Sequence, residues 1–239
     1  MLDVLLYSIE IITVLRNSRT RVPYNMNITE LASNRFTTKA YDASRPLTEQ
    51  QIADVLSLLQ NSPSTLNLQG WHFHVITTEA GREKIAPAIF DLNKTKVAQA
   101  PLAIVFSSIN GISEQHLDEL VAQEAQDGRF RDAEARQKND AGRRGYINNV
   151  AHSAEFQHKW MERQLYIALG FLLLGAPALG LHATPIEGFD TQEMDKILGL
   201  EAQGLHSVVM ATVGYNSDAD FNAQLPKSRF PLDKIITKL

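Results

Sequence analysis

Hydrophobic positions recur at helical spacing in several stretches of the chain. Between Thr48 and Asn61 apolar residues return every three or four positions, behind a capping box formed by Thr48 and Gln51. Similar spacing predicts helices over Glu79–Phe90, Ser113–Gln126 and Glu155–Ala176. A short capped helix and a polar loop are expected after Met26.

Shorter segments have the patterns of strands. Trp71–Thr77 alternates, Leu102–Ser107 is a continuous apolar run typical of a buried strand, and His206–Gly214 is the last segment of this kind. These strands are few and unevenly spaced, and a regular βαβ alternation is absent. The pattern therefore predicts an α+β fold.

Two apolar stretches raise the question of a membrane role. Leu2–Leu15 has no basic residue before it and no small-residue cleavage site after it, so it fits a secretory signal poorly. Leu165–Leu181 is short for a membrane span and contains Pro177. A fully buried core or interface helix is the better interpretation of the second stretch, and we expect no membrane association.

Composition narrows the function classes. The chain has 239 residues, a net charge of −4 and no cysteine. A nucleic-acid partner is not expected, because such binders usually carry a basic excess. Without cysteine the chain can form no disulfide, thiolate nucleophile, iron–sulfur cluster or Cys-ligated zinc site. A chain of this kind is compatible with a reducing compartment, and we expect a cytoplasmic protein.

Familiar catalytic patterns are missing. The sequence has seven histidines, but none form an H-x-x-x-H pair, and no acidic residue completes an evident metal triad with them. They are interpreted as ordinary core or surface histidines, and no metal is expected. The charged run from Arg129 to Arg144 is interpreted as a solvated helix face. No nucleophile elbow, P-loop or G-x-G-x-x-G fingerprint occurs.

Several loops hold cationic and amide groups between turn residues, and the blocks around them are distinctive in combination. They include S-P-S-x-x-N-x-Q-x-W-H-F at Ser62–Phe73, Q-E-x-x-D-G-R-F at Gln123–Phe130, P-I-E-G-F at Pro185–Phe189 and F-N-A-x-L-P-K-S-R at Phe221–Arg229. Over residues 26–239 the chain resembles the oxygen-insensitive NAD(P)H nitroreductase and dihydropteridine reductase group of the FMN-dependent nitroreductase superfamily. Residues 1–25 fall outside the resemblance as an N-terminal extension, and Met26 is an alternative start.

The resemblance implies a fold, an activity and partners. The fold would be a central, mostly antiparallel sheet flanked by helices, in an intertwined homodimer with FMN at the interface. Reducing equivalents would pass in a ping-pong cycle from NADH or NADPH to nitroaromatics, quinones or dihydropteridine-like acceptors. The chemistry would take place on the flavin, without a catalytic side chain. The alternative is a non-catalytic flavin-binding or flavin-storage protein on the same fold.

The resemblance also implies which residues bind the cofactor. Cations would bind the phosphate of FMN, and lysines would lie near its ribityl chain and the pyrimidine side of the flavin. Amide side chains would bind the polar edge of the ring. One segment would lie against the ring, with the backbone N–H groups of Glu187 and Gly188 at the flavin atoms N5 and O4. These residues are Arg35, Thr37, Lys39, Asn93, Lys96, Gln164, Pro185, Ile186, Glu187, Gly188, Lys227 and Arg229. Ser64, Thr65 and Asn67 would contact FMN from the second subunit.

Some positions depart from the family pattern, and they concern the acceptor. Phe36 replaces a histidine that is common in close relatives, and Gly145-Tyr146 replaces a pair of phenylalanines. We expect Phe36 and Tyr146 to contact the substrate. The segment from Gly111 to Val150 resembles the excursion that roofs the flavin in relatives.

Overall fold

The structure is a computed structural model that describes residues 27–239. The apolar stretch Leu2–Leu15 and the expected extension, residues 1–25, lie outside the described residues.

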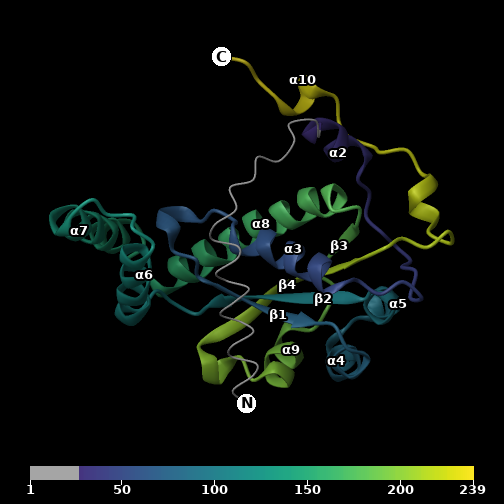
Figure 1. Cartoon of the computed structure of the whole chain (residues 1–239), viewed down its shortest axis with the longest axis horizontal. Helices are drawn as coiled ribbons and strands as arrows, with labels where there is room; N and C mark the ends of the chain where they lie inside the picture. Colours follow the sequence, from purple (N-terminus) through teal and green to yellow (C-terminus); the bar gives the residue numbers. More distant parts are fainter. Residues whose placement is uncertain (1–26) are drawn as a thin grey trace.

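A four-stranded antiparallel sheet forms the centre of the fold (Figure 1). Its strands are β1 (Trp71–Ile76), β2 (Leu102–Ile109), β3 (His182–Ile186) and β4 (Leu205–Gly214), in the order β1-β2-β4-β3. The predicted α+β class is confirmed, as are the strands predicted within Trp71–Thr77, Leu102–Ser107 and His206–Gly214. The continuous apolar run of β2 is buried on both faces of the sheet, which explains its lack of alternation.

Helices cover both faces of the sheet, and side chains of β2 alternate between two cores. Leu102, Ile104 and Phe106 pack with one group of helices, and Ala103 and Val105 with another. The first group consists of α3 (Glu49–Gln60) and α8 (Ala154–Ala178), and the second of α4 (Glu79–Ile85), α5 (Asp91–Gln99) and α9 (Thr191–Leu198). Figure 1 shows the sheet between these two layers.

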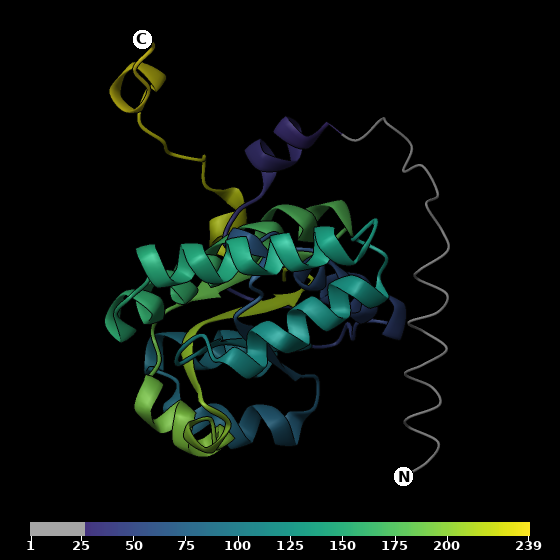
Figure 2. The ribbon, with the colours of Figure 1, turned by 90° about the vertical axis from the view of Figure 1, so that its left-hand side faces the viewer.

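A helical pair stands at one end of the sandwich (Figures 1 and 2). It consists of α6 (Glu114–Gln126) and α7 (Ala133–Val150). A third core, with Leu117, Ile147, Trp160 and Leu68, joins this pair to the beginning of α8 and to the loop before β1. The short helices α2 (Ile28–Asn34) and α10 (Leu232–Ile235) lie above the layer of α8, at the top of Figure 1.

The predicted helices agree with the structure except at one end. The capping box of Thr48 and Gln51 is present, and α2, α3, α6 and α8 lie where helices were expected. The helix predicted to reach Phe90 ends at Ile85, and the chain continues as a 3₁₀ turn that contains Pro87. Proline lacks the backbone N–H that an α-helix needs at that position. The pattern did not predict α5, β3 or α9.

One interpretation of polarity needs correction. Arg143 of the charged run is only 5% exposed and pairs with the equally buried Glu124 at 2.7 Å, so the solvated face does not include it. The stretch Leu165–Leu181 was expected to be a core or interface helix, and in the single chain its residues Tyr166, Ile167 and Phe171 are exposed. Among the described residues, no helix is both long and apolar enough to cross a membrane.

Candidate functional site

Three of the predicted cations share one pocket. Arg35, Lys227 and Arg229 line a cavity of about 380 Å³ between the end of α2 and the C-terminal segment, and no carboxylate is among its lining residues in the described chain. Burial, and next the charge of Arg229, lower the pKa of Arg35. Burial and the charges of both arginines lower the pKa of Lys227. Mutual repulsion of this kind favours a bound anion, because a bound anion relieves it.

Backbone carbonyls and buried polar side chains hold this pocket in shape. The Lys227 ammonium donates to the carbonyl oxygens of Ala32 and Arg35 at 2.7 and 2.6 Å, although 192 positions separate Lys227 from Arg35. Asn222 donates to the carbonyl oxygen of Thr37 at 2.7 Å. The buried carboxylate of Asp220 accepts from the Lys39 amide at 3.0 Å. The Arg35–Lys39 loop is therefore clamped onto the Phe221–Arg229 segment.

A second cationic pair continues from this pocket. Lys39 follows the clamped loop, and Lys96 lies on the half-buried side of α5. Burial, and next the charge of Lys39, lower the pKa of Lys96, so the two ammonium groups act on each other. An anionic group between them would reverse this repulsion.

Asn93 and Gly188 bring α5 against the loop that follows β3. The Asn93 amide donates to the Gly188 carbonyl oxygen at 2.9 Å. A Cβ atom at position 188 would lie 2.3 Å from the same amide nitrogen, so a larger residue there would displace the Asn93 side chain. Within the described chain, the N–H groups of Glu187 and Gly188 donate no hydrogen bond. Pro185 and Ile186 end β3 directly before them.

A third group of predicted residues lies elsewhere. The Thr65 amide donates to Gln164 Oε1 at 2.9 Å, and Asn67 donates to Glu124 Oε1 at 2.9 Å. Ser64 Oγ accepts from the Gln69 amide at 2.9 Å. Gln164 is buried and also donates to the Trp160 carbonyl oxygen, so both its oxygen and its nitrogen make a hydrogen bond inside its own chain.

The backbone of this loop is strained. Leu66, Asn67 and Gln69 all have positive φ values, of 50°, 57° and 47°, without being glycine. The buried Arg143–Glu124 pair holds the loop: Arg143 donates to the Leu66 carbonyl oxygen at 3.2 Å, and Glu124 accepts from Asn67. Such restrained strain is typical of functional segments.

The residues expected at the acceptor are also separated. The Phe36 ring packs against His182, with centroids 5.1 Å apart, beside Pro177 at the end of α8. Tyr146 on α7 lies near Trp160, with centroids 6.0 Å apart, and its side of the helix is exposed. A Cβ atom at Gly145 would meet no other atom, so the space next to Tyr146 is open.

The predicted residues thus form two groups within one chain. The first surrounds the end of α2, α5, the end of β3 and the C-terminal segment. The second, with Ser64, Thr65, Asn67, Gln164 and Tyr146, lies at the α6–α7 end of the molecule. Gln164 and Tyr166 are two positions apart on α8, about 200° around the helix, so Gln164 bonds to the second group on one side of α8 and Tyr166 bonds to Glu187 of the first group on the other.

Comparison with known proteins gives this arrangement a context. The model of the nitroreductase family matches residues 32–215. The chain belongs to the nitroreductase family. An oxygen-insensitive NAD(P)H nitroreductase of Salmonella typhimurium is 41% identical over 90% of this chain and 100% of its own length. Another from Enterobacter cloacae is 40% identical, over 89% and 100%.

Solved structures agree on the fold. One described as a nitroreductase in complex with FMN, from Exiguobacterium sibiricum, has a TM-score of 0.77. It covers 90% of this chain and 98% of its own, at 22% sequence identity. The family model ends at Tyr215, so Lys227 and Arg229 lie beyond it, while the two curated relatives match over their full length.

Several residues that shape the site were not predicted. Asp220, Asn222 and the Arg143–Glu124 pair support its loops, and Tyr166 donates to Glu187 at 2.6 Å. Asp220 and Asn222 lie inside or beside the block F-N-A-x-L-P-K-S-R, so their position in the sequence was a usable signal. Nothing in the sequence pattern pairs Arg143 with Glu124 or Tyr166 with Glu187.

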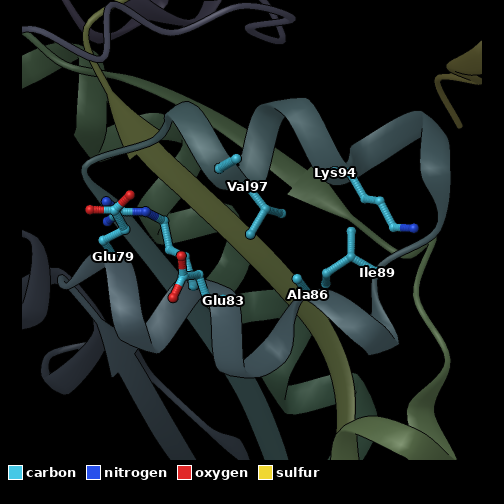
Figure 3. A pocket seen from close by; sticks show the side chains of 8 residues that line it. Glu79, Glu83, Ala86, Ile89, Lys94 and Val97 are labelled. Atoms are coloured by element: carbon cyan, nitrogen blue, oxygen red, sulfur yellow. The ribbon is translucent and has the colours of Figure 1, made fainter.

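A further cavity, of about 270 Å³, lies between α4 and α5 (Figure 3). Its rim is charged and its floor apolar, with Glu79, Glu83 and Lys94 at the rim and Ile89 and Val97 below them. Lys94 is already paired with Asp91 at 2.7 Å. None of the predicted cofactor residues line this cavity.

The interpretation of the histidines was wrong in one respect. Glu162 does complete a triad with two histidines, His158 and His206, which no spacing in the sequence revealed. His206 comes from β4, 44 positions after Glu162, and only the fold brings it there.

Proposed function

We propose that this protein is an FMN-dependent oxidoreductase that transfers reducing equivalents from NADH or NADPH to nitroaromatic or quinone acceptors in a ping-pong cycle. The observation that carries the proposal is the pocket of Arg35, Lys227 and Arg229, which has three cations and no carboxylate in the described chain. The chain's membership of the nitroreductase family and the names of its relatives support the same activity.

The residues present fit FMN from one end to the other. Arg35, Lys227 and Arg229 would bind the terminal phosphate, and Thr37 would add a hydroxyl beside them. Lys39 and Lys96 would hold the anionic side of the ring. The N–H groups of Glu187 and Gly188, which donate to no described group, would face its polar edge, with Asn93 fixing their loop.

FMN, when bound, accepts a hydride from the nicotinamide and passes electrons to the acceptor. The chain contributes binding, orientation and positive charge, and no side chain serves as nucleophile, acid or base. Dihydropteridine-like acceptors are included in the proposal, since a flat, polar heterocycle would suit the same open site. A cytoplasmic location follows from the need for NADH or NADPH.

The proposal includes a homodimer with FMN at the interface. Within one chain, the partners of Thr65, Asn67 and Tyr146 are Gln164, Glu124 and Trp160, none of which belongs to the first group, and a second copy would bring these residues and Ser64 to the cofactor. The exposed side chains of Ile167 and Phe171 on α8 provide apolar surface for such an interface. Phe230, Leu232, Ile235 and Ile236 of the C-terminal segment are exposed as well.

The decisive experiment follows the flavin spectrum anaerobically. The purified protein should be a yellow dimer that releases FMN, rather than FAD, on denaturation. NADH or NADPH should bleach the bound flavin, and a nitroaromatic or quinone should restore its colour. A flavin that stays oxidised with both nucleotides would refute the enzyme and leave the flavin-storage alternative. Release of FAD would contradict the assigned phosphate pocket.

A further inference from the structure

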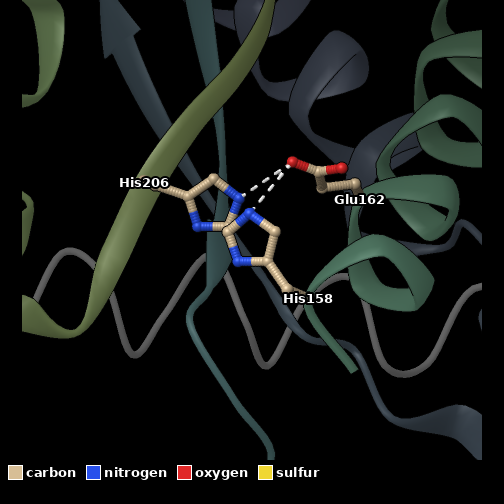
Figure 4. Close-up of side chains that lie close together, drawn as sticks. All are labelled: His158, Glu162 and His206. Carbon is tan, nitrogen blue, oxygen red and sulfur yellow. Dashed lines mark hydrogen bonds and ion pairs between the residues drawn. The ribbon is translucent and has the colours of Figure 1, made fainter. Parts of the chain in front are cut away.

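His158, Glu162 and His206 meet at one point on the side of the sandwich (Figure 4). His158 and Glu162 are one turn apart on α8, and His206 reaches them from the beginning of β4. Glu162 Oε1 lies 3.3 Å from Nε2 of each imidazole. One possible ligand atom of each residue lies close to the other two, and all three atoms lie within 4.8 Å of one another.

The two distances from Glu162 match those of a tetrahedral metal site. Zinc bonds to nitrogen and oxygen of about 2.0–2.1 Å set neighbouring ligand atoms of a tetrahedron about 3.3 Å apart. Both measured distances from Glu162 Oε1 equal that spacing. Two imidazoles and one carboxylate are also a ligand set that zinc commonly takes, with water as the fourth ligand.

The surroundings of the cluster orient its ligands. His206 Nδ1 lies 2.8 Å from Asn110 Oδ1, at the end of β2. In the tautomer that donates its Nδ1 proton to Asn110, Nε2 carries the lone pair that a metal ion needs. This second hydrogen bond is the usual support of a metal-binding histidine.

Glu162 Oε1 is the shared partner of both imidazoles in this structure. It lies 3.3 Å from Nε2 of His206, at hydrogen-bond distance, and equally far from Nε2 of His158. A divalent ion would replace these contacts and bind all three groups at once.

The cluster is open enough to exchange an ion with solvent. The His206 side chain is 15% exposed, Glu162 33% and His158 40%. Stacked rings direct their lone pairs in parallel, so metal binding requires one ring to turn. His158 is the more exposed of the two, and it can rotate without displacing core side chains.

We propose that His158, Glu162 and His206 form a binding site for a divalent transition-metal ion of the zinc type. The bound ion joins the first turns of α8 to the beginning of β4, and through Asn110 to the end of β2. Water completes its coordination. This site is separate from the cofactor pocket and does not depend on the function proposed above.

The test measures zinc binding by the whole chain, purified without a polyhistidine tag and carrying its flavin. We expect one zinc ion per chain in equilibrium dialysis, together with a rise in Tm as free zinc increases. Glu162→Gln and His206→Gln should each weaken zinc binding by about tenfold or more and abolish the rise in Tm. Both variants should retain their flavin, which shows that they fold.

His72→Gln is the matched control. His72 and His74 also form a close pair, with ring centroids 4.7 Å apart, but no carboxylate joins them in the described chain. This variant should bind zinc like the wild type. The proposal is overturned if the wild type binds no zinc at micromolar free metal. It is equally overturned if Glu162→Gln and His206→Gln bind zinc normally, or if His72→Gln loses as much affinity as they do.

Discussion

The Tyr166 hydroxyl donates a hydrogen bond of 2.6 Å to the carboxylate of Glu187. It joins the exposed face of α8 to the loop after β3, where the free N–H groups of Glu187 and Gly188 lie. Burial, and next the carboxylate of Glu187, raise the pKa of Tyr166 to about 12, so the hydroxyl remains a donor at neutral pH. Tyr166 and Asn93 therefore hold neighbouring residues of this loop, Glu187 and Gly188.

Removing this hydroxyl should slow flavin reduction more than it weakens flavin binding. The bond is partly exposed, so we expect Tyr166→Phe to lose about 1 kcal/mol, or roughly fivefold, in the rate of the reductive half-reaction. Stopped-flow absorbance with NADPH measures that rate. Tyr215→Phe is the matched control, because it removes a hydroxyl that is bonded to Gln51 on another part of the fold. Equal reductive rates in the wild type and Tyr166→Phe would contradict the positioning role.

Replacing Arg229 by alanine should weaken FMN binding. Loss of a charge-assisted contact to phosphate is expected to raise the Kd for FMN by about tenfold or more. Fluorescence titration of the flavin-free protein measures this change. Arg82→Ala, on α4 and away from the pocket, should leave the Kd unaltered. Unchanged flavin affinity in Arg229→Ala would remove Arg229 from the site.

Arg143 and Arg144 are neighbours in the chain with different expected contributions to stability. Arg143→Ala leaves Glu124 buried without its partner and should lower the free energy of unfolding by about 3–5 kcal/mol. Arg144 pairs with Asp118 and Asp140 near the surface, so Arg144→Ala should cost much less. Urea denaturation of both variants tests this difference, and equal losses would show that the buried pair has no special role.

The Tyr146 hydroxyl makes no hydrogen bond with the described chain, and the residue is 45% exposed. If it donates to a nitro or quinone oxygen, Tyr146→Phe should slow the oxidative half-reaction by about fivefold. The reductive half-reaction should change much less. Separate stopped-flow measurements distinguish the two steps. Equal oxidative rates would leave Tyr146 only its packing against Trp160.

His182 should make the protein less stable in mild acid. Burial lowers its pKa, and the weaker influence of Asp220 only partly opposes this. The unfolded state then binds the proton more readily, so stability falls as pH drops below the unfolded value of about 6.5. His182→Phe keeps an aromatic ring against Phe36 and removes the titration.

The Tm of the His182→Phe variant should accordingly fall less than that of the wild type between neutral and mildly acidic pH. His74 and His206 also have lowered pKa values, so part of the pH dependence will persist in the variant. An identical fall in both proteins would show that His182 does not contribute.

The sequence predicted correctly those helices and strands that depend on residues close together in the chain. The capping box of Thr48 and Gln51 and the apolar run of β2 both appear in the structure as expected. Helix α5 was missed because Val97 is its only buried residue, so it has no apolar stripe. β3 was missed because its polar Thr184 is buried, where its hydroxyl bonds to the Thr38 carbonyl oxygen.

The candidate site depended on a different kind of information. Physical reasoning from the sequence could not join Arg35 to Lys227, which are far apart in the chain, and only the family resemblance grouped them. His158 and Glu162 have a spacing that a helix brings together, but the position of His206 depends on the fold. Contacts between distant residues follow from topology, which no local pattern contains.

The left-handed loop from Leu66 to Gln69 has a consequence for engineering. Its geometry is maintained by Arg143, which lies 77 positions away on the helix that carries Tyr146. A mutant library that varies α7 to admit new acceptors will therefore also change the conformation of this loop, although the loop itself is not mutated. Such a library should keep Arg143 and Glu124 unchanged, or it should vary the residues of the loop together with those of the helix.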